Sequence, residues 1–169
     1  MNQWKEVKPE EWNHNPFDKI GKEWMLVTAE KEGKANCLTA SWGGVGVLWG
    51  KNVVYIFIRD SRYTKEFIDG SDTFSLTFFD RSKYAELLSY MGKTSGRTED
   101  KIAKCGLSVA HEEDTPYFEE ASCAILCRKL CCQKVEPQNF CVEGIDGQFY
   151  GDKDYHNMYV GEIVKILEK

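Results

Sequence analysis

A run of six β-branched and aromatic residues, Val53-Val54-Tyr55-Ile56-Phe57-Ile58, constrains the fold of this chain more than any other segment. Residues of these types favour strands, and the run has no polar face. It therefore predicts a strand that is buried on both sides. Such a strand needs neighbouring strands and covering layers, which the rest of the chain must supply.

Further strands are predicted on both sides of this run, at residues 24–29, 37–42, 73–79, 121–135 and 159–167. Helical patterns lie between them at residues 61–68, 82–91 and 98–106. Ser61 and Thr98 are the expected N-caps of the first and third helix. Strands, inserted helices and strands again indicate an antiparallel α+β barrel, mainly β, and not a βαβ array.

Charge and cysteine content exclude several classes of protein. The net charge of −5 opposes binding of DNA or RNA, whose affinity comes largely from phosphate neutralisation by basic side chains. Seven cysteines, an odd number, follow a polar N-terminus without a signal-peptide pattern. These features predict free thiols and a cytoplasmic protein. Every apolar stretch is far shorter than the ~20 residues of a membrane helix, so no membrane contact is expected.

The glycine-rich residues 43–51 suggest a nucleotide loop, but their spacing is wrong. The pattern G-x-G-x-x-x-G is one residue longer than the dinucleotide fingerprint. For a phosphate-binding P-loop, Val45 stands where the first glycine belongs, and Asn52 stands where serine or threonine is needed. We interpret this stretch as a tight turn between strands.

Four cysteines gather near residue 130, at Cys123, Cys127, Cys131 and Cys132. On a strand, residues four apart are separated by about 13 Å, too far to share one zinc ion. Three scattered histidines add no cluster. We predict that these cysteines are buried structural thiols and that the chain holds no metal.

Three segments carry hydroxyls, cations and glycines in patterns that suit a planar, phosphorylated ligand, namely residues 36–44, 59–64 and 93–101. The first combines two hydroxyls on a strand edge with Trp42, which suits the face of a ring. The second places two arginines at the start of a predicted helix, where they suit a phosphate. The third is again basic and rich in hydroxyls. Each segment alone is equally consistent with an ordinary turn or cap.

At these segments the sequence resembles the flavin reductase-like family, in particular its flavoredoxin-like branch. The resemblance rests on Asn36-x-x-Thr39-Ala40-Ser41-Trp42-Gly43-Gly44, Arg59-x-x-Arg62-Tyr63-Thr64, Ser95-Gly96-Arg97-x-x-Asp100-Lys101, and Asp154-Tyr155-His156 followed by Tyr159-Val160-Gly161-Glu162-Ile163. It extends over residues 15–167, so we expect one domain over residues 1–169. The resemblance implies an FMN-binding split β-barrel, antiparallel and Greek-key-like, with a few inserted short helices.

The resemblance also implies roles for individual residues. The isoalloxazine ring would be lined by the first motif, at Thr39, Ala40, Ser41 and Trp42, with Asn36 as the motif's first cofactor-binding residue. The phosphate and ribityl chain would be held by Arg59, Arg62, Tyr63 and Thr64. A second anion contact would come from Ser95, Gly96, Arg97 and Lys101.

His156 is the one catalytic candidate. Its neutral imidazole would orient nicotinamide or an acceptor, with Asp154 fixing its tautomer and the arginines at the other end of the flavin. The sequence departs from the usual family pattern at Cys37-Leu38 and Asp60-Ser61, and Cys37 would put a thiol near the flavin.

Three functions stay open. The leading one is an oxidoreductase that binds FMN non-covalently, takes electrons from NADH or NADPH and passes them to an acceptor, usually as a homodimer with the flavin near the subunit interface. The second is a flavoredoxin-like electron carrier or FMN-binding module that serves a redox partner protein without turning over free nicotinamide. The third is an interaction domain that has lost flavin. Hydride transfer is the cofactors' own chemistry, so neither a catalytic triad nor a metal is required.

Overall fold

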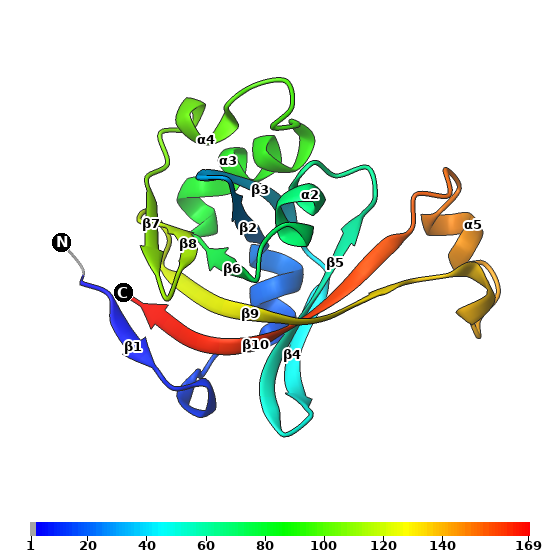
Figure 1. Ribbon diagram of the computed structural model, residues 1–169, viewed down its shortest axis with the longest axis horizontal. Coiled ribbons are helices and arrows are strands. Elements are labelled where there is room, and N and C mark those ends of the chain that lie inside the picture. The colour runs from blue at the N-terminus through cyan, green and yellow to red at the C-terminus, as the bar shows by residue number, and fades with distance from the viewer. Residues whose placement is uncertain (1–2) are drawn as a thin grey trace.

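The computed structural model describes residues 3–169 and contains one curved antiparallel sheet with an open edge (Figure 1). Its eight strands are β1 (Lys5–Val7), β2 (Met25–Lys31), β3 (Lys34–Ala40), β4 (Gly43–Leu48), β5 (Lys51–Arg59), β6 (Thr73–Phe78), β9 (Cys123–Lys134) and β10 (His156–Glu168). The hydrogen-bonded order is β3-β2-β6-β9-β10-β5-β4, and β1 pairs with β10. A separate two-stranded sheet consists of β7 (Val109–Glu112) and β8 (Thr115–Phe118). The predicted antiparallel, mainly β class is confirmed.

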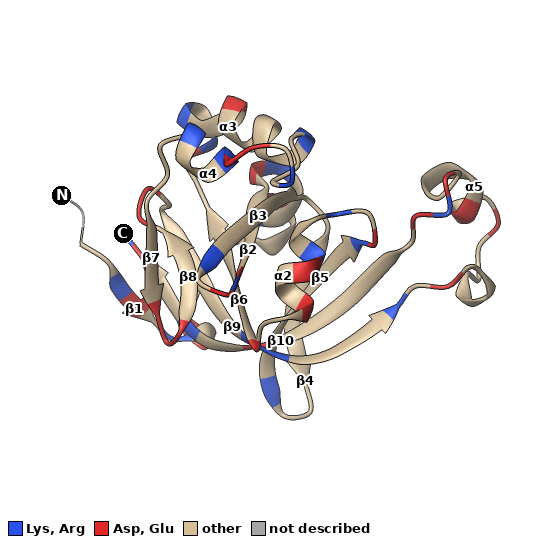
Figure 2. Ribbon diagram, turned by 45° about the horizontal axis from the view of Figure 1, so that its top comes forward, with Lys and Arg blue, Asp and Glu red and all other residues tan. Residues whose placement is uncertain are grey.

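The helices are short, and most connect strands. They are α1 (Pro16–Asp18), α2 (Thr64–Asp69), α3 (Arg81–Lys93), α4 (Lys101–Lys104) and α5 (Ile145–Phe149), with single helical turns η1 (Pro9–Glu11), η2 (Lys19–Glu23) and η3 (Pro137–Asn139). Among the helices of residues 3–169, none has the length and apolar character that a membrane crossing requires. Acidic and basic residues are interspersed over helices, loops and strand ends (Figure 2).

The helix caps differ from those expected. Asp80 caps α3, its carboxylate accepting a hydrogen bond from the Ser82 amide at 3.0 Å, and Asp100 caps α4 in the same way. Tyr63 occupies the N-cap position of α2 and makes no side-chain capping bond, so the predicted caps Ser61, for α2, and Thr98, for α4, are wrong. Both predictions placed the helix start too early, because polar turns that precede a helix contain the same residue types as caps.

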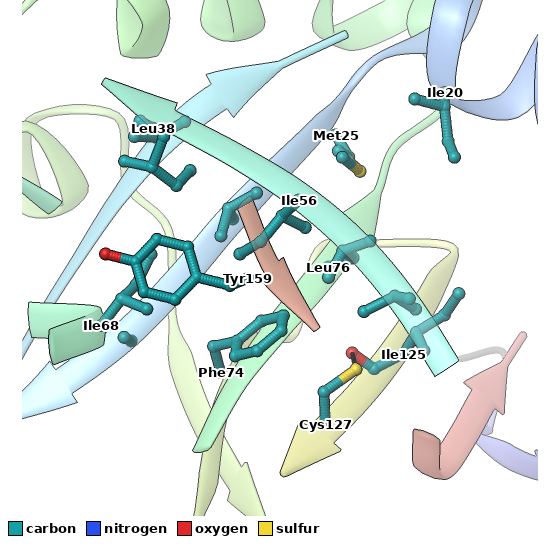
Figure 3. Close-up of a cluster of buried hydrophobic side chains, with 14 of the residues drawn as sticks. Ile20, Met25, Leu38, Ile56, Ile68, Phe74, Leu76, Ile125, Cys127 and Tyr159 are labelled. Carbon is teal, nitrogen blue, oxygen red and sulfur yellow. Dashed lines mark hydrogen bonds between the residues drawn. The ribbon is translucent and has the colours of Figure 1, made fainter. Parts of the chain in front are cut away.

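The barrel interior is filled by side chains that alternate along the strands (Figure 3). Tyr159 from β10 and Phe74 and Phe78 from β6 are the largest of them and are fully buried. Gly161 makes room for the Phe74 ring, since a Cβ atom at this glycine would lie 2.5 Å from Cζ of that ring. A second buried cluster packs α3 against the outer face of the sheet around Leu26 and Leu88.

Two sequence interpretations need correction. Most of the glycine-rich stretch is not a turn but strand β4, which pairs with β5, and only Trp49 and Gly50 form the turn. Residues 121–135 do contain the long predicted strand β9, but its cysteines are not all buried. Cys131 is half-buried and Cys132 is exposed, because β9 leaves the core beyond Cys127.

An arm of residues 135–155 connects β9 to β10 and extends away from the barrel (Figure 1). It carries η3 and α5, and no sequence pattern predicted it. The arm is attached to the barrel through Arg59 of β5, as described below.

Candidate functional site

The main cavity lies where the sheet is open, between edge strand β3 and the end of β5. Strand β4 pairs with β5 only as far as Ile56, so Phe57, Ile58 and Arg59 have β10 on one side and the cavity on the other. The cavity has a volume of about 220 Å³. It is lined by Leu38, Thr39, Ala40, Ser41, Trp42, Phe57, Ile58, Arg59, Arg62 and His156.

A second, small pocket of about 80 Å³ continues from the main cavity and shares Leu38 and Arg62 with it. Its other lining residues are Asn36, Ser61, Tyr63, Thr64, Gly92, Lys93, Thr94, Ser95, Gly96 and Lys101. The fold thus brings together His156 and the three segments predicted to bind a ligand, residues 36–44, 59–64 and 93–101, although up to 120 positions separate these residues in the sequence. Of the predicted cofactor-binding residues, Arg97 alone lines neither space.

Two cations line the small pocket, the buried Lys101 and the half-buried Arg62. Lys101 is 2% exposed, and its Nζ donates hydrogen bonds to the carbonyl oxygens of Met91 and Thr94, each at 2.9 Å. Arg62 donates from Nη1 to the Gly92 carbonyl at 2.9 Å. Within residues 3–169, no carboxylate lies within the 4.0 Å of an ion pair with either cation. Burial lowers the pKa of both groups, and for Arg62 the negative charge of Asp154 acts in the opposite direction.

Arg59 lines the main cavity, and its guanidinium is also bonded within the protein. Its guanidinium donates hydrogen bonds to the carbonyl oxygens of Phe149 and Asp154, each at 2.9 Å, and lies 5.1 Å from the ring centre of Tyr150. Arg59 therefore fastens the arm to the barrel at the rim of the main cavity. Only Arg62 of the two arginines reaches the small pocket.

His156 lies in the main cavity and is 8% exposed. Its Nδ1 lies 2.7 Å from the hydroxyl oxygen of Tyr150. Burial, together with the nearby charge of Arg59, lowers the pKa of His156 to about 4, so the imidazole is neutral at neutral pH. The expected partner Asp154 instead accepts hydrogen bonds from the amide and hydroxyl of Ser61. The prediction that Asp154 fixes the tautomer is wrong, because Asp154 turns toward the start of the β5–α2 loop.

The expected separation of His156 from the arginines is also wrong. His156 and Arg59 are direct partners in the β10–β5 ladder, and both line the main cavity. The two paired residues are 97 positions apart in the sequence, so local motifs could not predict that they are neighbours.

Several predicted hydroxyl and amide groups serve to hold the walls in place. Thr39 donates from Oγ1 to the Leu88 carbonyl of α3 at 2.5 Å. Asn36 donates from Nδ2 to Oγ1 of Thr64 at 2.9 Å, and both residues are buried. These bonds fix β3 against α3 and α2, so the cavity walls are set by interactions within the protein.

Cys37 lines neither the main cavity nor the small pocket and faces α3. Its thiol is fully buried at 3.7 Å from the sulfur of Met91, and burial raises its pKa to about 12. The expectation of a thiol beside the ligand is therefore wrong, because Cys37 is buried against Met91 and reaches neither space. Among residues 3–169, no group of three or more His, Cys, Asp or Glu side chains is placed to bind a metal ion.

Trp42 follows β3 and stands at the mouth of the main cavity, where it is 47% exposed. Its ring lies edge-on to Phe149 of the arm, with 5.5 Å between ring centres, and 5.3 Å from the ring of His156. Sequence reasoning missed Tyr150 and Phe149 because nothing marked the arm as part of the site. It also missed Leu38 and Phe57, which read only as apolar strand residues.

The comparisons with known proteins agree with this geometry. The model of the flavin reductase like domain matches residues 17–169. None of the curated proteins matches the sequence significantly. Solved structures of the same fold include a flavoredoxin from Methanosarcina acetivorans, which has a TM-score of 0.67 and 23% sequence identity and covers 87% of this chain and 68% of that one.

Two further structures have the same fold. An FMN-binding domain of a flavin reductases-like enzyme from Shewanella baltica has a TM-score of 0.71 and 18% identity, over 99% of this chain and 78% of that one. An NADH:FAD oxidoreductase from Streptomyces globisporus has a TM-score of 0.63 and 13% identity, over 87% of this chain and 74% of that one. At these identities the likeness shows the fold, a split β-barrel.

Proposed function

This chain belongs to the flavin reductase like domain family, and from that membership we propose that it binds FMN and acts as an NADH- or NADPH-dependent oxidoreductase that passes electrons to an acceptor. The observation that carries the proposal is a pair of cations, the half-buried Arg62 and the buried Lys101, in a small pocket at the end of a larger cavity. Both cations lack a carboxylate partner within residues 3–169, and a phosphate dianion supplies the missing charge.

The residues present fit the two halves of FMN. The phosphate fits the small pocket, where the hydroxyl of Ser95 accompanies the two cations. The ring fits the main cavity, whose walls include the apolar side chains of Leu38 and Phe57. β3 is an edge strand, and its unpaired main-chain groups are suited to hydrogen bonding with the polar edge of the ring.

Bound FMN supplies the hydride and electron chemistry, and the protein supplies binding, orientation and exclusion of water. Trp42 and Phe149 shield the cavity mouth. His156 presents a neutral ring beside the flavin position, and Tyr150 occupies its Nδ1, which leaves Nε2 for a ligand. We propose that this nitrogen positions nicotinamide or an acceptor.

The S. globisporus structure, described as an NADH:FAD oxidoreductase, supports a nicotinamide donor for this chain, and the flavoredoxin structure supports the alternative of an electron carrier. Anaerobic addition of NADH or NADPH to FMN-loaded protein separates the two. We expect bleaching of the flavin absorbance with either nucleotide. Binding of FMN without bleaching would leave the electron carrier, and failure to bind FMN would contradict both functions.

We further propose a homodimer with the cavity near its interface. Phe17 is 83% exposed and lines an apolar hollow of about 410 Å³ that shares Trp42 with the main cavity. An apolar hollow beside an exposed phenyl ring is suited to a protein interface. Light scattering should give twice the mass of one chain, and Phe17→Asp should lower it. The seven free cysteines support our proposal of a cytoplasmic location.

A further inference from the structure

Tyr150 belongs to the arm, yet its hydroxyl contacts the imidazole that lines the main cavity. The hydroxyl oxygen lies 2.7 Å from Nδ1 of His156, and both residues are buried. Among residues 3–169, neither the hydroxyl nor Nδ1 has another hydrogen-bond partner. Each of the two groups therefore depends on the other for its hydrogen bond.

The direction of this bond follows from the hydrogens that the two groups carry. When the Tyr150 hydroxyl donates to Nδ1, its hydrogen is paired, and the neutral ring carries its own hydrogen on Nε2. In the opposite tautomer Nδ1 donates, and the buried hydroxyl hydrogen has no acceptor within the described chain. An unpaired buried donor is unfavourable. The structure thus favours the tautomer with the hydrogen on Nε2.

Nε2 of His156 is available to a ligand in the main cavity. It has no hydrogen-bond partner in the part of the chain that the structure describes. In that part, the side-chain nitrogen and oxygen atoms that are both buried and unpartnered belong to Trp12, Thr28 and Tyr90, so Nε2 is not sealed inside the protein. A hydrogen on Nε2 makes this atom a donor, and a donor requires an acceptor on the ligand.

The barrel holds the segment around Tyr150 in place. Arg59 donates hydrogen bonds to the carbonyl oxygens of Phe149 and Asp154, and its guanidinium lies 5.1 Å from the centre of the Tyr150 ring. The Tyr150 amide donates to the Asp146 carbonyl at 2.8 Å. The hydroxyl is therefore fixed in front of the imidazole by bonds on both sides of it in the sequence.

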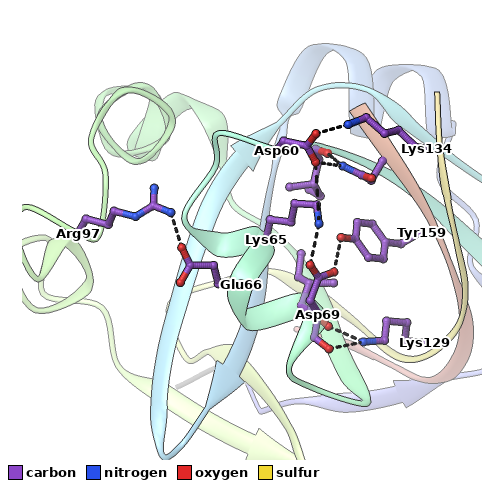
Figure 4. Close-up of polar contacts among 11 residues, drawn as sticks. Asp60, Lys65, Glu66, Asp69, Arg97, Lys129, Lys134 and Tyr159 are labelled. Carbon is purple, nitrogen blue, oxygen red and sulfur yellow. Dashed lines mark hydrogen bonds and ion pairs between the residues drawn. The ribbon is translucent and has the colours of Figure 1, made fainter. Parts of the chain in front are cut away.

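The two ends of the arm meet at Asp60. Lys134, the last residue of β9, forms an ion pair with this carboxylate (Figure 4). Asn157, the second residue of β10, donates from Nδ2 to its other oxygen at 2.7 Å. His156 precedes Asn157, so these contacts hold the imidazole and the arm in a fixed relation.

We propose that Tyr150 is a positioning residue that keeps the hydrogen of His156 on Nε2, so that the imidazole donates a hydrogen bond to a carbonyl oxygen of the flavin's reaction partner. The inference rests on the proposed function and adds to it a residue and the chemistry of the ligand. The carbonyl belongs either to the carboxamide of nicotinamide or to an electron acceptor such as a quinone. Both present the same group to Nε2, and the experiment distinguishes them.

The first test measures the tautomer in flavin-free protein, by ¹⁵N NMR of labelled histidine side chains. The signals of His156 are those that disappear in His156→Gln. We expect the hydrogen on Nε2 alone in wild-type protein and a mixture of tautomers in Tyr150→Phe, which keeps the ring and removes only the hydroxyl. A hydrogen on Nδ1 in wild-type protein, or an unchanged tautomer in Tyr150→Phe, would overturn the inference and leave the proposed function intact.

Tyr155→Phe is the matched control. The Tyr155 ring stacks on that of Tyr150, with 4.9 Å between ring centres, and its hydroxyl donates to Asp146 within the arm at 2.6 Å. This variant loses a tyrosine hydroxyl from the same aromatic stack, but not the one that contacts His156. It should keep the wild-type tautomer.

The second test identifies the reaction partner by anaerobic stopped-flow measurements on FMN-loaded protein. NADH carries a carboxamide, menadione carries quinone carbonyls, and ferricyanide carries no carbonyl. Tyr150→Phe should raise the half-saturating concentration of NADH or of menadione about 2- to 10-fold and leave the reaction with ferricyanide unchanged. An effect with NADH assigns the bond to the carboxamide, and an effect with menadione assigns it to the acceptor. An effect with neither, or an equal effect with ferricyanide, would overturn the inference, and absence of FMN binding would overturn the proposed function as well.

Discussion

Replacement of Arg62 by alanine tests the assignment of the phosphate end of the site. Arg62 lines both the main cavity and the small pocket, and its guanidinium donates a hydrogen bond to the Gly92 carbonyl there. Losing a hydrogen bond to a charged group costs about 1.5–3 kcal/mol, which corresponds to a roughly 10- to 150-fold weaker affinity. Arg62 is half-buried, so solvent screens this contact less than it screens a fully exposed pair.

Riboflavin makes the measurement specific, because it has the ring of FMN but no phosphate. In calorimetric titrations, Arg62→Ala should lose the stated affinity for FMN and change little toward riboflavin. Arg62→Lys should recover part of the loss, since it restores the charge without the planar fork. Thermal unfolding of each variant checks that the fold is intact.

Arg59→Ala is the comparison variant, because the Arg59 guanidinium donates its hydrogen bonds to carbonyl oxygens of the arm. It should affect FMN and riboflavin alike through the arm. Equal losses for both flavins in Arg62→Ala, or FMN affinity as tight as in wild type, would refute the placement of the phosphate beside Arg62.

Three further outcomes are expected. His156 has a folded-state pKa of about 4, below its ordinary value of 6.5, so on acidification the unfolded chain binds a proton before the folded chain does. The free energy of unfolding should therefore be greatest above pH 6.5 and fall as the pH drops toward 4. In urea unfolding, the free energy of unfolding of His156→Gln should depend less on pH over that window. A thiol reagent should modify the exposed Cys132 and Cys141 in native protein and spare the three fully buried thiols, and mass spectrometry showing the reverse would contradict the burial. Gly161→Ala should destabilise the protein by about 1–3 kcal/mol because its Cβ meets a buried phenyl ring, whereas Gly147→Ala, which meets nothing within 4 Å, should cost little; equal unfolding midpoints would argue against this packing.

The strands were predictable because their signal is local. Runs such as residues 53–58 contain the β-branched and aromatic residues that favour strands, and β5 appears there at Lys51–Arg59. The pairs formed by β1 with β10 and by β7 with β8 were missed, because three or four residues are too few to carry a periodic pattern. The arm was missed for the opposite reason, since it is a long connection with little regular structure.

The site was predictable as a set of residues but not as a geometry. The sequence motifs included most of the residues that line the two spaces, because short polar segments near strand ends can be recognised in a sequence. The contacts of each side chain could not be predicted from the motifs. Arg59 finds its partners 90 and 95 positions away, and Tyr150 reaches His156 only once the arm has folded back. Arg97 was expected at the ligand and instead contacts Glu66, a choice set by tertiary packing.

The position of β10 between β9 and β5 has a consequence for the order of events during synthesis. Residues 57–59 of the cavity wall have no paired strand until β10 has docked, because β4 does not reach them. His156 is the first residue of β10. Pairing over such long separations is slow compared with hairpin formation. A ribosome-bound chain that ends before β10 therefore has the motifs of β3 and β5 but no completed cavity. Cofactor uptake by a growing chain should begin only after the last strand emerges, which makes flavin fluorescence a marker of finished folding.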